Sequence, residues 1–244
     1  MTRQFNGILF DLGWTLEIPE TGDWMLTRKF REYYPLELQQ SVDPVLWRNA
    51  LMKASQPLIE HHQMRTREEE EDAFTGFYYD LITNAGLQIT KEIAREISHD
   101  RTYVYEPKYI LLPDIRDLLL KLRKQNYRIG IISDTWPSTV QRLESYGIAN
   151  LFDCASYSYE LGIFKPDPRL YHDALKKIGL PAQQCIFADD LPGNLEAAQK
   201  LGIHPVQSLV KPGIKADPRF DSIRRPSELL ELLNRKCDQN VQCS

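Results

Sequence analysis

Residues 185–190, Cys-Ile-Phe-Ala-Asp-Asp, together with the stretch that follows them to Gly202, decide the fold of this chain. Four apolar residues that run into an aspartate pair predict a buried strand over 185–189. Residues 194–201 then have helical spacing and end at Gly202, a residue type favoured directly after a helix. The segment therefore predicts a strand, a polar turn and a helix, which is the repeating unit of an α/β protein.

The same alternation extends to both sides of this segment. An early strand over 7–10 ends at Asp11, and the regular pattern starts at Pro113. Strands that alternate with helices of about ten residues indicate a parallel sheet covered on both faces. We predict an α/β fold with a Rossmann-like sheet. Its further elements are helix 114–125, strand 128–133, helix 137–145, strand 151–156, helix 168–178, a short strand near Val206 and helix 227–235.

Between the first strand and Pro113 the pattern is helical. Asp43 before Pro44 predicts one helix start, and Thr66 with Glu69 has the spacing of a capping box for a helix that ends before Gly86. Thr90 can cap another helix that continues to 101, and the run 68–72 is expected to form a solvated helix face. We predict an all-helical cap of residues 17–105, inserted into a catalytic core of residues 1–16 and 106–244.

Composition excludes several classes of protein. The 30 basic and 34 acidic residues give a net charge of −4, with no basic block of the kind that binds nucleic acid. No stretch approaches the roughly 20 apolar residues of a membrane span. Residues 1–6 lack a signal core, so we expect a cytoplasmic protein. Its four cysteines, without metal-site spacing, are expected to be reduced thiols: Cys154, Cys185, Cys237 and Cys243.

Polar side chains follow several of the predicted strands. Asp11 follows the first strand, Ser133 ends the second, and Asp189 with Asp190 closes a later one. Lys165 lies in a loop just before a helix. In open α/β sheets, ligands bind outside the carboxyl ends of the strands. The set therefore predicts a site for a divalent cation and a phosphoryl group.

Each of these residues also has a structural interpretation. Asp11 can cap a turn, Ser133 can satisfy a backbone group at a strand end, and Lys165 can be a solvated loop cation. The adjacent Asp189 and Asp190 are harder to explain, because two carboxylates after a buried strand repel each other and a cation offsets that cost. The joint occurrence of the residues in this order favours the functional interpretation.

Four segments resemble the motifs of the haloacid dehalogenase-like superfamily, most members of which are phosphatases. Residues 8–16 (ILFDLGWTL) are similar to the nucleophile motif, and 131–134 (IISD) to the phosphate-binding motif. Residues 162–168 (GIFKPDP) are similar to the third motif, and 186–190 (IFADD) to the metal motif. The helical insert after the first motif matches the cap of one large subgroup in position.

The resemblance implies a nucleophile and a metal site. Asp11 would attack phosphorus and form an aspartyl-phosphate. Mg²⁺ would be held by the Asp11 carboxylate, the main-chain carbonyl of Gly13 and the Asp190 carboxylate, with Asp189 near or on the metal. The substrate would be a small phosphorylated metabolite.

The resemblance also implies a set of phosphoryl contacts. Ser133 and the backbone N–H groups around Asp134 would hold the phosphoryl oxygens. Lys165 would neutralise Asp11 and the transferring group. Ser133 and Lys165 would thus act with Asp11 in catalysis, and with Asp134 in substrate binding.

Gly13 departs from the family pattern. Its phosphatases carry an Asp at this position, which protonates the leaving group and is typically worth about 10²–10⁴-fold in rate. A main-chain carbonyl survives the change, but the general acid does not. We therefore expect a slow or selective enzyme. Glu17, His61 and His62 are candidates to replace this general acid, although each is also interpreted as a solvated surface residue.

Two tryptophans lie beside these motifs. Trp14 replaces the usual glycine and is interpreted either as loop packing or as an aromatic wall of the site. Trp136, just after the phosphate-binding motif, is expected near the active edge of the sheet.

Three functions remain open at this stage. The leading one is a Mg²⁺-dependent phosphatase of monoesters or acyl phosphates. The second is a catalytically silent protein that binds a phosphorylated ligand, which Gly13 motivates. The third is a carbon-centred hydrolase such as a dehalogenase, against which the acidic pair argues. A phosphonatase using Lys53 of the cap is a minor form of the third.

Overall fold

The computed structural model describes residues 4–104 and 108–242. The chain divides into two compact units, which we call the sheet unit and the helical unit. The sheet unit consists of Met1–Ile18, Leu111–Thr135 and Leu143–Ser244. The helical unit consists of Pro19–Ile110 and Trp136–Arg142.

The sheet unit contains a six-stranded sheet in the order β5-β4-β1-β6-β7-β8, and every neighbouring pair is parallel. Its strands are β1 (Gly7–Phe10), β4 (Arg128–Ser133), β5 (Cys154–Tyr157), β6 (Cys185–Asp189), β7 (His204–Ser208) and β8 (Asp221–Ile223). The parallel sheet is confirmed. Phe10 of β1 pairs with Ile131 of β4 and Ala188 of β6, so the residues after β1, β4 and β6 emerge at one edge.

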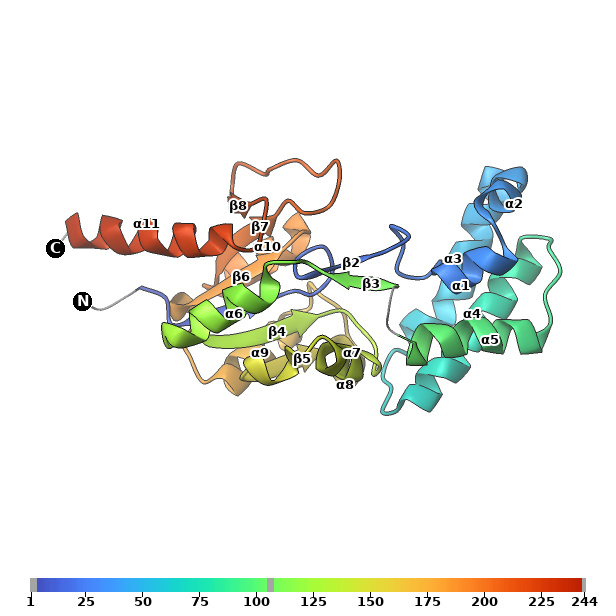
Figure 1. Cartoon of the computed structure of the whole chain (residues 1–244), viewed down its shortest axis with the longest axis horizontal. Coiled ribbons are helices and arrows are strands. Elements are labelled where there is room, and N and C mark those ends of the chain that lie inside the picture. Colours follow the sequence, from blue (N-terminus) through green and yellow to red (C-terminus); the bar gives the residue numbers. More distant parts are fainter. Residues whose placement is uncertain (1–3, 105–107, 243–244) are drawn as a thin grey trace. The chain divides into compact units, whose positions relative to one another are not determined.

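Helices lie on both sides of this sheet (Figure 1). They are α6 (Ile115–Lys124), α8 (Ser158–Leu161), α9 (Pro168–Ile178), α10 (Pro192–Lys200) and α11 (Glu228–Gln242). The residues of α7 (Thr139–Ser145) up to Arg142 belong to the helical unit, and those from Leu143 belong to the sheet unit. α9 and α10 share an apolar core with β1, β4 and β6, which includes Leu9, Ile132, Leu170, Phe187 and Leu195. This core fixes the strands that carry the polar edge.

Several element boundaries differ from the predictions. The strand predicted over 151–156 begins only at Cys154, because residues 149–151 form a short 3₁₀ turn. The sequence analysis also missed β8 and the pair β2 (Glu17–Pro19) and β3 (Tyr109–Leu111). All three are three-residue strands, which are too short to show an alternating pattern.

The helical unit contains five helices in the described residues 19–104 and 108–110. They are α1 (Arg28–Tyr33), α2 (Leu36–Ser41), α3 (Pro44–Glu60), α4 (Arg67–Asn84) and α5 (Lys91–Tyr103). The predicted caps are present. The Asp43 carboxylate accepts the N–H groups of Val45 and Leu46, both at 2.9 Å. The Thr66 hydroxyl accepts the N–H of Glu69 at 3.2 Å.

An aromatic core holds these helices together. Phe30, Phe74, Tyr78 and Leu81 are fully buried in it. Trp136, from the segment that follows β4, packs against the same core. The predicted cap of residues 17–105 stays a prediction, and in the structure residues 136–142 group with the helical insert.

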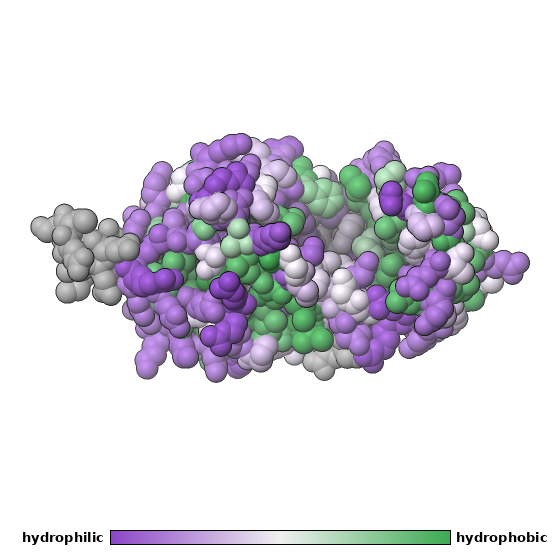
Figure 2. All heavy atoms as spheres, turned by 90° about the horizontal axis from the view of Figure 1, so that it is seen from above, coloured by the Kyte–Doolittle hydropathy of each residue, from purple (hydrophilic) through white to green (hydrophobic). Residues whose placement is uncertain are grey.

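Hydrophilic residues cover most of the face seen in Figure 2, with apolar residues gathered in smaller patches. Among the described residues, none of the helices combines the length and the apolar character required to span a membrane. Cys154 and Cys185 are free thiols, with Cys185 buried. The side chain of Cys237 and the whole of Cys243 lie outside what the structure describes.

The buried His62 predicts a pH dependence of stability. Burial lowers the pKa of His62 to about 4, whereas the unfolded chain takes up this proton near pH 6.5. Between these values the unfolded state binds more protons, so the free energy of unfolding falls by up to about 1.4 kcal/mol per pH unit as the pH drops. His62→Gln is expected to remove this contribution, as measured by urea unfolding from about pH 7 to 5.

The neighbouring His61 gives a matched control because its side chain is exposed. His61→Gln should retain the pH dependence of the wild type. Parallel stability curves for the wild type and His62→Gln would contradict the assignment.

Candidate functional site

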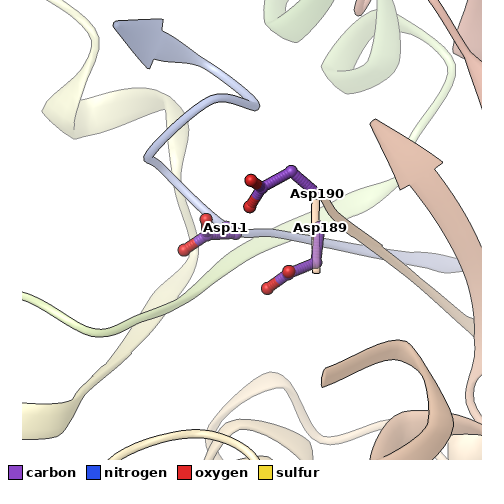
Figure 3. Close-up of side chains that lie close together, drawn as sticks. All are labelled: Asp11, Asp189 and Asp190. Atoms are coloured by element: carbon purple, nitrogen blue, oxygen red, sulfur yellow. The ribbon is translucent and has the colours of Figure 1, made fainter. Parts of the chain in front are cut away.

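Three aspartates meet at the carboxyl edge of the sheet. Asp11 follows β1, and Asp189 and Asp190 end and follow β6. Their carboxyl groups lie close together (Figure 3), and one oxygen from each falls within 4.8 Å of the others. All three side chains are buried. The parallel register of β1 and β6 produces this cluster, because it brings the two strand ends to the same level.

Lys165 joins this cluster from the loop before α9. Its Nζ donates to Oδ1 of Asp11 and to Oδ2 of Asp189, both at 2.7 Å, and to the carbonyl of Ile132 at 3.3 Å. Burial by itself lowers the pKa of Lys165, but the charges of Asp11 and Asp189 outweigh it and hold the pKa above its ordinary value. The ammonium group is therefore a permanent positive charge within the site.

Asp189 is fully saturated with hydrogen bonds. Besides Lys165, it accepts the N–H of Leu191 at 2.7 Å, and the amide of Asn194 donates to both of its oxygens at 3.1 and 3.0 Å. Asn194 lies in the first turn of α10 and is itself buried. Asp189 thus has the contacts of a residue that orients Lys165.

The site has more negative than positive charge. Burial raises the pKa of Asp11 to about 8 against the opposing attraction of Lys165, and the charge of Asp189 adds to the rise. Burial, with the charge of Asp189, also raises the pKa of Asp190 to about 6. The carboxyl groups of Asp11 and Asp190 therefore resist ionisation, and a divalent cation bound at this cluster would favour their ionised forms.

The segment after β4 forms the next wall of the site. Ser133 is the buried last residue of β4. Asp134 is exposed, and its carboxylate accepts the N–H of Lys165 at 2.9 Å. The N–H of Thr135 donates to the hydroxyl of Ser158 at 2.8 Å. Asp134 is thus held to the loop that supplies Lys165, and Thr135 is held to the start of α8.

The loop after Asp11 contains Gly13 and Trp14. Trp14 has a left-handed backbone with φ of 54°, which is uncommon for a bulky residue. Its N–H donates to the carbonyl of Glu17 at 2.8 Å, and its own carbonyl accepts the Ser208 hydroxyl at 2.7 Å. Ser208 ends β7 and was missed by the sequence analysis, although its place at a strand end was a usable signal.

A family model described as a haloacid dehalogenase-like hydrolase matches residues 24–202, which is well over half of the chain. The chain belongs to this family. The match includes the segments of Ser133, Lys165 and Asp189–Asp190 and begins after Asp11. The resemblance noted from the sequence is thereby confirmed.

Curated relatives of this haloacid dehalogenase-like hydrolase include phosphatases. The chain is 26% identical over 143 residues to a glyceraldehyde 3-phosphate phosphatase of Methanopyrus kandleri, covering 55% of this chain and 60% of the relative. It is 28% identical over 127 residues to a phosphoglycolate phosphatase of Colwellia psychrerythraea, covering 48% and 56%. The chain thus spans less than two thirds of the length of either relative.

A solved structure described as a dehalogenase has the same fold. It matches with a TM-score of 0.67 at 20% identity, over 95% of this chain and 98% of that one. At this identity the likeness concerns the α/β architecture of the family and not the reaction.

The candidate substitutes for the family's acid have different environments. The expectation that Glu17 and His62 are solvated is wrong, because both are buried. Glu17 accepts the hydroxyl of Tyr146 at 3.0 Å, and His62 packs edge-on against Trp136 in the helical unit, with ring centroids 4.6 Å apart. His61 is exposed, as expected. Lys53, the candidate for phosphonate chemistry, is also exposed and donates to Asn84 at 3.1 Å.

Removal of the buried ammonium group should destabilise the metal-free protein. Lys165→Met leaves Asp11 and Asp189 buried without their cation, and breaking a buried ion pair typically costs about 3–5 kcal/mol. We expect a loss of this size in the free energy of unfolding, measured by urea denaturation in EDTA.

Lys177 provides a comparison within the same unit. It forms ion pairs with Asp173 and Glu160 at the surface, with 36% of its side chain exposed. Lys177→Met should cost less than about 1 kcal/mol. Equal losses for the two variants would show that the Lys165 contacts do not stabilise the site.

Proposed function

We propose that this protein is a Mg²⁺-dependent phosphatase that hydrolyses phosphate monoesters or acyl phosphates through an aspartyl-phosphate on Asp11. One observation carries the proposal: a buried lysine links Asp11 to Asp189 beside a third carboxylate at one sheet edge. The phosphatase relatives support the same reaction class.

In this mechanism an oxygen of Asp11 bonds to phosphorus as the bond to the leaving oxygen breaks. Ser133 and the backbone N–H groups beside Asp134 would hold the phosphoryl oxygens. The Lys165 ammonium stabilises the charge that develops on them, because a fixed charge in a buried site needs no reorganisation during reaction. Water then attacks the acyl phosphate, which releases inorganic phosphate and restores the Asp11 carboxylate.

Mg²⁺ would be held by the carboxylates of Asp11 and Asp190 and the main-chain carbonyl of Gly13. Asp189 acts as a positioning residue, because its oxygens are already occupied by Lys165 and Asn194. When bound, the ion supplies charge stabilisation for the transferring phosphoryl group.

Gly13 sets the expected substrate preference. Without a carboxylic acid at this position, the leaving oxygen departs unprotonated or takes its proton from water. Acyl phosphates tolerate this loss because a carboxylate is a good leaving group. We therefore propose a small phosphorylated metabolite, with acyl phosphates turned over faster than alkyl esters.

The deciding assay compares turnover of acetyl phosphate and p-nitrophenyl phosphate with Mg²⁺ and with EDTA. Wild type should be active only with Mg²⁺, and Asp11→Asn should lose activity to background. With an alkyl phosphate as a third substrate, Gly13→Asp should raise turnover by about 10²–10⁴-fold, since it restores a general acid. Gly13 is not among the glycines with a left-handed backbone, so a side chain there meets no backbone strain of that kind.

Gly13→Asn is the matched control, because asparagine has the same shape as aspartate and no proton to donate. Equal gains for Gly13→Asp and Gly13→Asn would refute the acid role. An inactive wild type that becomes active as Gly13→Asp would instead favour the second function that Gly13 motivates, a silent protein that binds a phosphorylated ligand.

A further inference from the structure

The helical unit contains a buried ion pair that also binds the segment after β4. Glu70 of α4 is fully buried, and its Oε1 accepts from the Arg101 guanidinium at 2.7 Å. The same carboxylate accepts two bonds from Ser138, through the backbone N–H at 2.7 Å and the hydroxyl at 2.8 Å. Glu70 therefore joins α4, α5 and the segment 136–142.

Aromatic rings complete this contact. The Arg101 guanidinium lies 3.4 Å from the ring centroid of Phe74, and Phe74 meets Trp136 edge-on at 4.9 Å. Trp136 also packs against His62. Both residues that flank Pro137 are thus fixed within the helical unit, one by packing and one by hydrogen bonds.

The residues just before this segment are held elsewhere. Asp134 accepts from Lys165, and Thr135 donates to Ser158, both within the sheet unit. Only Trp136 and Pro137 lie between Thr135 and Ser138, so the connection is short. A displacement of Ser138 that exceeds the slack of this connection acts on Thr135 and, through it, on the strand end at Ser133.

We propose that Glu70 is a positioning residue for the phosphoryl site. Its buried carboxylate holds Ser138 and so sets the position of the strand end that carries Ser133. The inference rests on the proposed function, in which Ser133 contacts the phosphoryl group. Glu70 would then act on catalysis through the main chain of residues 133–138.

A charged residue at this position needs an explanation other than stability. Apolar pairs of similar volume often replace a buried ion pair without loss of stability. An apolar side chain, however, cannot accept the N–H of Ser138. The same two helices carry a second ion pair, Asp72 with Arg95, whose side chains are largely exposed. That pair links α4 to α5 at the surface and therefore serves as a control.

The test uses Glu70→Leu/Arg101→Met, which removes both buried charges together and leaves neither unpaired. Ser138→Ala is a milder second variant that removes only the hydroxyl bond. Thermal melting checks that each variant is folded at the assay temperature. With Mg²⁺ and acetyl phosphate, the double variant should lose about 10–100-fold in kcat, because small displacements of catalytic groups cost that much. Asp72→Asn should stay within about twofold of wild type.

The Ser133→Ala background separates positioning from general damage. If Glu70 acts through Ser133, adding Glu70→Leu/Arg101→Met to Ser133→Ala should change kcat by no more than about twofold. If the combined variant instead loses kcat by the product of the two separate losses, the inference is overturned. A folded Glu70→Leu/Arg101→Met variant with wild-type kcat would also overturn it.

A second readout keeps the inference separate from the proposed function. Calorimetry with inorganic phosphate measures the site without turnover. If wild type binds phosphate but does not hydrolyse acetyl phosphate, the phosphatase proposal fails alone. The inference then stands if Glu70→Leu/Arg101→Met weakens phosphate binding about tenfold or more, and it falls if affinity is unchanged. If the wild type neither binds phosphate nor hydrolyses acetyl phosphate, both the phosphatase proposal and the inference about Glu70 are refuted.

Discussion

The ammonium group of Lys165, buried between Asp11 and Asp189, is the interaction on which the rest of the site depends. It brings together the ends of β1 and β6 and the loop before α9, three segments far apart in the sequence. Its charge offsets only part of the repulsion among the three aspartates. The remaining negative charge favours a cation at this edge, which is what the proposed function requires.

Much of this arrangement could be predicted from the sequence. Parallel strands place their carboxyl ends together, so residues such as Asp11 and Asp189 could be assigned to one edge before any coordinates. The helix caps at Asp43 and Thr66 could also be predicted, because capping depends on the local spacing of residues. The family model then confirmed the resemblance of the later motifs.

The features that could not be predicted from the sequence depend on tertiary packing. Glu70 lies in the run 68–72, and the expectation of a solvated helix face there is wrong for Glu70, which is fully buried. Trp136 was expected near the sheet edge, and its ring packs into the core of the helical unit. Neither the burial of Glu70 nor the packing of Trp136 follows from the composition or from the spacing of apolar residues. Both depend on residues 136–142 grouping with a helical unit whose remaining residues precede them in the chain.

The central place of β1 also has a consequence for how the chain is made. Gly7 pairs with Arg128 on one side and with Cys185 on the other. A nascent chain therefore carries β1 as an unpaired, wholly apolar strand until synthesis has passed Arg128. The helices of residues 28–103 emerge during this interval and can gather before the sheet does. Asp11, which directly follows β1, is thus translated well before the strands that surround it in the folded sheet.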